Sequence, residues 1–270
     1  MIKNTLKVLK KDKSLAFAYI TLGVIGLMIL LSFILNIDAN AIDASAKLQK
    51  PSINHIFGTD ELGRDYFARA LYGGRISLSV GILSMLISIV IGTAIGVTSG
   101  YIGGRIDNFI MRTIDILMSI PSFLVLIVLN SYLRPSVSTI IIIIGILSWM
   151  DVARIVRGET LKIKQNEYCL AAKALGIRTK NIIFRHIVLN LKDVILVAGS
   201  LNIASAILTE SALSFLGLGI QLPLASWGNM LQDAQRHMFD NLYLAIFPGV
   251  LIFLTVMSLT IISKKLSDVK

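Results

Sequence analysis

Long runs of apolar residues, separated by short polar or charged stretches, repeat along the whole chain. Six runs reach or approach the ~20 apolar residues that a helix needs to cross a bilayer. They cover residues 14–37, 77–99, 113–129, 136–150, 194–215 and 241–263. Because a helix satisfies its own backbone groups in lipid, the pattern predicts an all-α, polytopic membrane protein with about six transmembrane helices.

The composition supports this class. Of the 270 residues 55% are hydrophobic and 16% are charged, whereas soluble domains average about 45–50% and about 25%. Disordered chains and water-soluble enzymes are thereby excluded. The single cysteine, Cys169, excludes a disulfide framework and a cysteine-based zinc site.

Basic residues predict the orientation in the membrane. Placing the N-terminus inside puts most of the 26 Lys and Arg residues on the cytoplasmic side. We therefore expect a multi-pass protein of the cell membrane with both termini in the cytoplasm. The net charge of +10 then reflects topology, and no nucleic-acid partner is predicted. The first apolar run exceeds the 7–15 residues of a signal-peptide core, so we expect it to be retained.

Two polar segments are too long to be simple connections. They are residues 38–76, predicted outside, and 151–193, predicted inside, whereas tight helix–helix connections have about 2–8 residues. We divide the chain into an N-terminal helix with an extracytoplasmic segment, 1–76, and a core, 77–270.

The inner segment predicts a short helix, a glycine turn and a second helix. Asn166 is a candidate N-cap, Glu167 suits the positive end of the helix, and Gly176 suits a left-handed C′ position. Thr179 is a candidate cap for the second helix. The first helix has a small apolar face of Leu170, Ala171, Ala174 and Leu175, and the second repeats Ile183, Ile187 and Leu191. The first helix could dock into a groove on a partner or pack on its own bundle, and the pattern leaves both open.

Two further patterns concern the second and third predicted spans. Gly92, Gly96, Gly100 and Gly104 share one helix face, which favours close helix packing over a gap for substrate. Pro121 is expected to kink the third span, because it lacks a backbone donor.

A polar stripe marks the fifth span. Asn202, Ser205 and Thr209 follow helical spacing, and Glu210 is adjacent. Such a stripe can line a wet path, or it can form interhelical hydrogen bonds. Glu210 could also lie at the outer interface.

Charged residues near the spans suggest local roles. Arg112 and Asp115 are three residues apart and can pair on one helix. Asp60, Arg64 and Asp65 are expected to form a solvated turn.

Four blocks in the expected order resemble the peptide/nickel permease family of ABC importers, and in particular its C-type subunit. Leu170 and Leu189 depart from the family pattern, which often has Glu and Pro there. The C-terminus also lacks the usual Asn and Gly-Asp. The blocks are His55-x-x-Gly58-Thr59-Asp60-x-Leu62-Gly63-Arg64-Asp65, Gly100-Tyr101-x-Gly103-Gly104-x-x-Asp107, Ala171-Ala172-x-x-x-Gly176, and Leu213-Ser214-Phe215-Leu216-Gly217-Leu218-Gly219.

The resemblance implies a type I ABC importer permease fold and a complex. Its partners would be a sister permease in a heterodimer, two ATPase subunits and an extracytoplasmic substrate-binding protein, all at the lipid bilayer. It also places the fifth span near the translocation path. The implied ATPase-coupling residues are Glu167, Leu170, Ala171, Ala172, Ala174, Leu175, Gly176, Arg185 and His186.

The chain is not expected to be an enzyme. It has no G-x-x-x-x-G-K-[ST] motif, so ATP and Mg are expected on the partner subunits and no cofactor on this chain. An intramembrane hydrolase is disfavoured because His55, His186 and His237 all lie outside the predicted spans. Peptides, nickel or cobalt, and metal-chelator complexes remain open as substrates. The alternative is an ATP-independent channel or secondary transporter.

Overall fold

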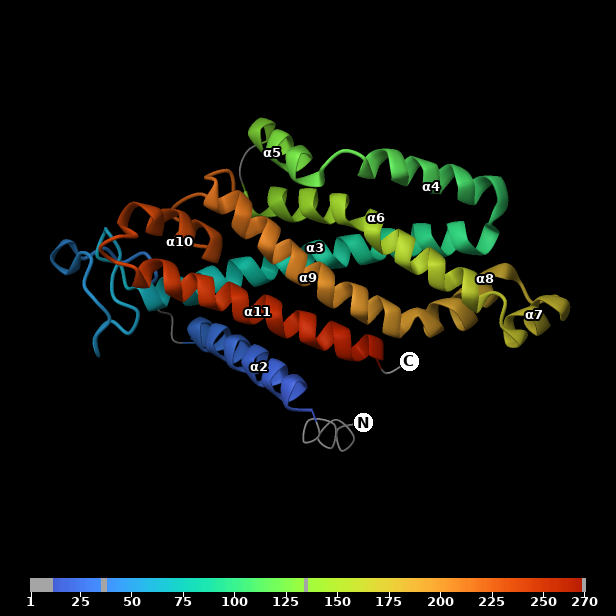
Figure 1. The fold of residues 1–270 in the computed structure, drawn as a ribbon, viewed down its shortest axis with the longest axis horizontal. Coiled ribbons are helices and arrows are strands. Elements are labelled where there is room, and N and C mark those ends of the chain that lie inside the picture. The colour runs from blue at the N-terminus through green and yellow to red at the C-terminus, as the bar shows by residue number, and fades with distance from the viewer. Residues whose placement is uncertain (1–11, 35–37, 134–135, 269–270) are drawn as a thin grey trace.

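The computed structural model describes residues 12–34, 38–133 and 136–268. Within these ranges the regular elements are helices, and the long ones run side by side along the long axis of the molecule (Figure 1). The prediction of an all-α membrane protein is therefore confirmed. Five helices are long and apolar enough to cross a membrane, namely α2 (Lys13–Ile34), α3 (Tyr66–Ile102), α6 (Val137–Ile163), α9 (Lys192–Phe215) and α11 (Tyr243–Asp268).

A sixth span is broken. The helices α4 (Gly104–Met118) and α5 (Ser122–Tyr132) together meet the same test but are bent by 73°. Pro121 lies at the break and precedes α5, so the predicted kink at this residue is confirmed. The predicted span over 113–129 therefore consists of parts of two helices, because the chain starts a new helix after the proline.

Two helices are longer than their apolar runs predict. α3 begins at Tyr66 rather than at 77, and α6 continues to Ile163 rather than ending at 150. In the added part of α6, Val152 and Val156 are buried while Arg154 faces outward. The extension of α6 is thus amphipathic, which a search for apolar runs does not detect. The predicted boundary at residue 76 falls inside α3.

Glycines set the distance between α3 and α6. A Cβ atom added at Gly92 would lie 2.6 Å from Cβ of Val152, and one at Gly96 would lie 2.6 Å from the carbonyl oxygen of Ala153. Gly100 is similarly close to Thr160. The predicted packing role is confirmed for these three glycines.

Gly104 does not belong to this face. It begins α4 with a φ of +60°, and a Cβ added there would meet nothing within 4 Å. The prediction for this residue is wrong, because α3 ends at Ile102 and the chain turns.

One end of the bundle is covered by loops and short helices, which we call the loop cap (residues 38–65 and 216–242). It contains η1 (Ala44–Ala46), α10 (Trp227–Ala234) and η4 (Gln235–His237). The Tyr243 hydroxyl donates to the carbonyl of Gln49 at 3.0 Å, and Phe57 stacks on Phe247 with ring centres 3.9 Å apart. These contacts join the cap to α11.

The cap contains a buried charge cluster where the sequence predicts a solvated turn. Asp60 pairs with Arg64 at 2.6 Å, and each is 5% exposed. The Asp60 carboxylate also accepts a hydrogen bond from the backbone N–H of Leu62, and Nε of Arg69 lies 3.6 Å from it. Asp65 instead caps α3, because it accepts from the backbone of Ala68. The solvated-turn prediction is wrong, because the packing of the cap covers these groups.

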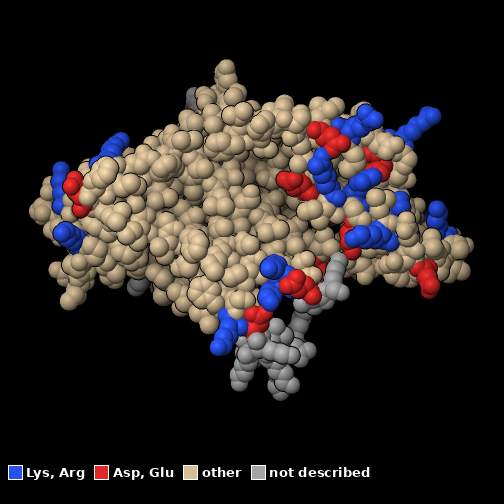
Figure 2. Space-filling model, in the orientation of Figure 1, with Lys and Arg blue, Asp and Glu red and all other residues tan. Residues whose placement is uncertain are grey.

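The remaining charges are unevenly placed. In Figure 2 Lys, Arg, Asp and Glu gather toward the two ends, and a broad belt between them shows mostly uncharged residues. Exposed apolar residues of the membrane-spanning helices include Leu83, Leu86 and Val90 of α3 and Ile142 of α6. A belt that is mostly uncharged and apolar is the surface that a bilayer requires.

The glycine packing leads to a stability prediction. We expect Gly96→Ala to lower the free energy of unfolding by about 1–3 kcal/mol, because the new methyl group meets backbone of α6. The matched control is Gly26→Ala in α2, where the added carbon meets nothing within 4 Å. Thermal unfolding of both variants in detergent tests this, and equal melting temperatures would contradict it.

Candidate functional site

The predicted inner loop forms a distinct projection at the end of the bundle opposite the loop cap (Figure 1). It contains α7 (Glu167–Ala174), α8 (Thr179–Ile182), the π-helical turn η2 (Ile183–Ile187) and the 3₁₀ turn η3 (Val188–Leu191). We call residues 164–191 the α7–α8 segment. Its first helix and glycine turn agree with the sequence prediction.

The glycine turn has the predicted geometry. Gly176 has a φ of +74°, and the N–H of Ile177 donates to the carbonyl of Ala172 at 3.1 Å. This pattern satisfies the last carbonyls of α7 and needs a left-handed residue. A side chain at Gly176 would meet nothing within 4 Å, so the backbone conformation alone favours glycine there.

The predicted helix caps are only partly correct. Asn166 is at the N-cap position of α7, but its side chain donates to the Tyr168 hydroxyl at 3.0 Å rather than accepting from the backbone. Thr179 is the first residue of α8, and Arg178 takes the cap position without a side-chain bond. The cap prediction for Thr179 is wrong.

The second helix is irregular. After α8 the chain makes the π turn and then the 3₁₀ turn, so the predicted four-residue repeat is not kept. Ile182, Ile187 and Leu191 are buried, whereas Ile183 is only partly buried. The extra residue of the π turn shifts the buried position from Ile183 to Ile182. Such turns often occur at functional sites.

The α7–α8 segment has one packed face and one exposed face. Cys169 and Ala172 are buried against the bundle, whereas Leu175 is 81% exposed. His186 is partly buried near Tyr168. The exposed members of the predicted coupling set are Glu167, Leu170, Ala171, Ala174, Leu175, Gly176 and Arg185. Exposed leucines beside basic residues form a surface typical of a docking site.

Ion pairs hold the base of this segment. Arg157 of α6 donates twice to Asp107 of α4, both at 2.6 Å, and Ser99 of α3 also donates to Asp107. Lys164 donates to the carbonyl of Gly100 at 2.7 Å. The ends of α3, α4 and α6 are therefore tied together directly before α7 begins.

A second ion pair corrects a sequence prediction. Asp115 pairs with Arg154 of α6 rather than with Arg112 of its own helix. Local spacing made Arg112 the nearest candidate, but the packing of α4 beside α6 brings Arg154 to the carboxylate.

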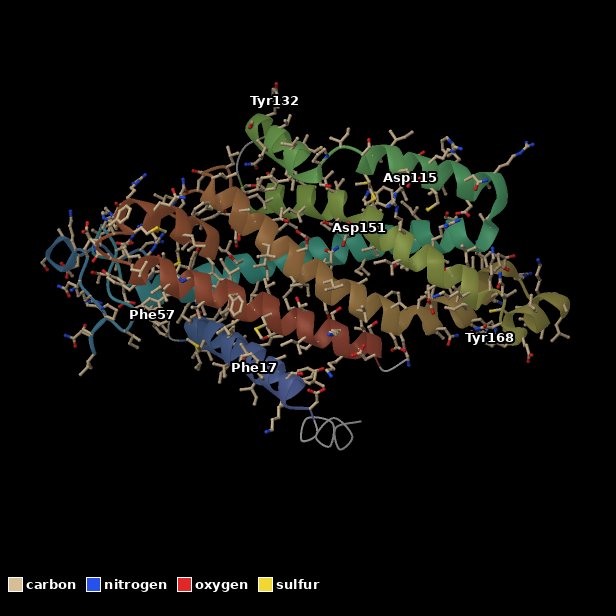
Figure 3. The ribbon with its side chains drawn as sticks, viewed as in Figure 1. Phe17, Phe57, Asp115, Tyr132, Asp151 and Tyr168 are labelled. Atoms are coloured by element: carbon tan, nitrogen blue, oxygen red, sulfur yellow. The ribbon has the colours of Figure 1, made fainter. Side chains whose placement is uncertain are left out.

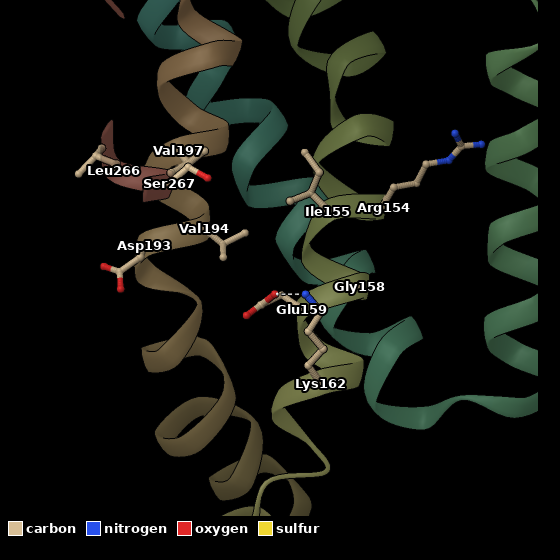
Figure 4. Close-up of a pocket in the computed structure, with 10 residues that line it drawn as sticks. All are labelled: Arg154, Ile155, Gly158, Glu159, Lys162, Asp193, Val194, Val197, Leu266 and Ser267. Atoms are coloured by element: carbon tan, nitrogen blue, oxygen red, sulfur yellow. Dashed lines mark hydrogen bonds and ion pairs between the residues drawn. The ribbon is translucent and has the colours of Figure 1, made fainter. Parts of the chain in front are cut away.

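A pocket of about 390 Å³ opens between α6, α9 and the end of α11 (Figure 4). Arg154 and Lys162 line it from α6, and Asp193 lines it from α9. Lys162 also pairs with Glu159 at 3.1 Å. The pocket is open, charged and at the same end of the bundle as the α7–α8 segment.

The residues of the predicted polar stripe on α9 differ in how deeply they are buried. Ser205 is exposed, and Asn202 and Thr209 are partly exposed. Glu210 is fully buried and accepts from Ser77 at 3.0 Å. The first three can face a path or a partner, whereas Glu210 faces the interior. Glu210 is buried near the end of α9, which is Phe215, and its position at the outer interface stays a prediction.

Glu210 lies at the centre of a polar cluster between α3, α9 and the loop cap. It also accepts from Ser214 at 2.7 Å, and Ser214 accepts from the N–H of Ile220. Ser77 accepts from the N–H of Trp227. The carboxylate thus fixes two backbone segments of the cap through two serines.

Asp151 is a further candidate site residue, which the sequence analysis did not single out. It is exposed on α6, and within the described ranges it has no hydrogen-bond or ion-pair partner. Figure 3 shows it near the middle of the long axis. The sequence does place a carboxylate directly after the predicted span 136–150. Because α6 extends beyond residue 150, this carboxylate lies within a membrane helix. Among the described residues, no group of three or more His, Cys, Asp or Glu could hold a metal ion.

Comparison with known proteins identifies relatives. Residues 92–268 match the family described as "Binding-protein-dependent transport system inner membrane component". The chain is 44% identical over 219 residues to a dipeptide transport system permease protein of Bacillus subtilis, covering 81% of this chain and 68% of that protein. It is 39% identical over 267 residues to an oligopeptide transport system permease protein of the same organism, covering 96% and 88%. A glutathione transport system permease protein of Pectobacterium atrosepticum is 37% identical over 261 residues, covering 96% and 87%.

Cys169 offers a test of the α7–α8 geometry. Burial raises the pKa of its thiol, so less thiolate is present at neutral pH and maleimide should react slowly. Gly176→Val should increase the labelling rate at least several-fold, because a β-branched residue disfavours the left-handed turn and loosens α7.

The labelling rate can be followed by mass spectrometry, since the chain has one cysteine. Gly176→Asn is the matched control, because asparagine tolerates the left-handed region. Fast labelling of the unaltered protein would contradict the packing of α7.

Proposed function

The chain belongs to the family of binding-protein-dependent transport system inner membrane components, and from this premise we propose that it forms one half of the translocation path of an ATP-driven importer. A sister permease would supply the other half as a heterodimer. The observation that carries the proposal is the exposed face of the α7–α8 segment, where Leu170 and Leu175 project from a basic tip. The chain itself is a transport subunit rather than an enzyme.

We propose that an ATPase subunit binds the exposed face of the α7–α8 segment, with one such subunit on each permease half. ATP and Mg would be bound by those subunits. Leu170 and Leu175 would supply the apolar anchor, and Gly176 would set the angle of α7. A partner that contacts this tip differently in its open and closed states would bias the transporter between two conformations.

The ion pairs at the base of the segment suggest how the movement spreads. Asp107, Arg157 and Lys164 connect α3, α4 and α6 directly before α7. A displacement of α7 would therefore move these helix ends together. The break at Pro121 would let α4 move with them while α5 stays in place.

We propose that Asn202, Ser205 and Thr209 line the translocation path, together with Asp151. Exposed polar groups at membrane depth are costly toward lipid, so a water-filled path or a partner is their favoured neighbour. The charged pocket of Figure 4 would then be the inner mouth of this path. Glu210 would act behind the path, as the group that holds the loop cap.

The proposed orientation in the membrane rests on one ion pair and on the distribution of charge. Asp12 pairs with Lys265 at 2.7 Å, which brings the start of α2 beside the end of α11. This contact supports termini on one side of the cell membrane, and the basic α7–α8 segment supports the cytoplasm as that side. The loop cap would face outward and receive the substrate-binding protein.

We propose short peptides as the substrate. The names of the relatives refer to dipeptides, oligopeptides and glutathione, which supports peptides over the nickel, cobalt or metal-chelator alternative. A channel or secondary transporter would leave the exposed leucines of the α7–α8 segment without a role.

Docking can be tested at the tip. We expect Leu175→Asp to weaken binding of the purified ATPase subunit at least tenfold, because a buried anchor typically contributes about 2 kcal/mol or more. Phe239→Asp is the control, since Phe239 is fully exposed in the loop cap at the opposite end. Equal affinities of the two variants in a binding titration would refute docking at this tip.

Uptake by proteoliposomes tests the function. With the complete complex and ATP, labelled dipeptides and oligopeptides should accumulate, and without ATP they should not. Uptake that is independent of ATP would favour a channel or secondary transporter. Accumulation of a nickel chelate but of no peptide would overturn the proposed substrate.

A further inference from the structure

Two adjoining cavities lie along α3, between this helix and the α7–α8 segment. The first, of about 480 Å³, is lined mainly by apolar side chains such as Ile89, Val97 and Phe184. The second, of about 650 Å³, lies at the end of α3 and is lined by residues that include Lys164 and Lys173. Both share Thr98 and Ile183 as lining residues. We call them together the α3 groove.

The groove changes from apolar to basic along its length. Its α3 wall runs from Ile89 to Ile102, which is about 20 Å at 1.5 Å per residue. Half of the hydrocarbon core of a bilayer is about 15 Å thick. The apolar part therefore matches the depth of an acyl chain, and the basic part matches the level of a headgroup. Among the described residues that line the two cavities, none is acidic.

We propose that the α3 groove binds an anionic phospholipid of the cytoplasmic leaflet. An acyl chain would lie on Ile89, Val97 and Phe184, and the phosphate would lie between Lys164 and Lys173. Basic pockets between membrane helices on the cytoplasmic side are a known means of binding anionic headgroups. The choice of leaflet rests on the orientation proposed above.

The lysines can serve a headgroup without losing their present contacts. Lys164 donates one hydrogen bond to the carbonyl of Gly100, and an ammonium group has three donors. Lys173 is exposed on α7. The buried hydroxyl of Thr93, which also lines the apolar cavity, has no hydrogen-bond partner among the residues that the structure describes.

A lipid in this groove would join two parts of the proposed coupling apparatus. One wall belongs to α3, and the other to the π turn through Ile183 and Phe184. The bound lipid would fill the space between them and stabilise the π turn against α3. Anionic lipid would thereby favour a rigid connection between α7 and the bundle.

The test uses the purified transporter complex, stripped of lipid in detergent. Phosphatidylglycerol and phosphatidylcholine with the same acyl chains are titrated separately, and thermal unfolding and native mass spectrometry report binding. We expect phosphatidylglycerol to raise the melting temperature more than phosphatidylcholine. Lys173→Gln should remove this excess, and Ala94→Phe, which fills the apolar part, should reduce the shift with both lipids.

The matched control is Lys180→Gln, which removes the same charge from the same segment outside the cavities. It should leave the phosphatidylglycerol excess unchanged. Equal shifts with the two lipids, or an equal loss in Lys180→Gln, would overturn the site. A shift with free glycerol phosphate of the same size would also overturn it, because the acyl chain would then have no role.

One competing occupant is a helix of the sister permease. A crosslink from Ala94→Cys, in a Cys169→Ala background, to the sister chain would refute the lipid proposal. None of these measurements requires transport. A failure of the lipid site is therefore distinct from a failure of the proposed importer function.

Discussion

The close approach of α3 and α6 is the constraint on which the rest of the structure depends. Gly92, Gly96 and Gly100 bring the backbones so near that a single added carbon atom would collide. In lipid no hydrophobic effect drives helices together, so close van der Waals contact has to supply the stability. The pair then forms a fixed core on which α9 packs and from which the α7–α8 segment extends.

Polar contacts fasten the more loosely placed elements to this core at its two ends. At one end Asp107 and Arg157 tie α4 to α6, and at the other Glu210 ties the loop cap to α3. The carboxyl groups of Asp107 and Glu210 are both buried, and each makes several hydrogen bonds. Removing one partner would leave the other buried and unsatisfied, which costs more than the pair contributes. The helices of the bundle are thus positioned at their ends as well as along their length.

The sequence predicted the class and the local turns better than the long-range pairs. Apolar runs located the membrane helices, and the four-residue glycine repeat predicted their packing except at Gly104. The left-handed turn at Gly176 followed from local rules. Asp115 was assigned to Arg112, and Asp60 to solvent, because their true partners and covering groups come from other elements. The exposed carboxylate of Asp151 was missed since the charged extension of α6 does not look like part of a membrane helix.

The length of α6 has a mechanical consequence. Its 27 residues make an unbroken rod of about 40 Å, longer than the ~30 Å hydrocarbon core. A rod of this kind acts as a lever: a tilt of ~10° about its far end displaces its near end by ~7 Å. Because α3 packs closely against α6 over much of this length, the two helices would rotate as one rigid body. Force applied at α7 would then arrive at membrane depth as a rotation, with little of it absorbed by bending.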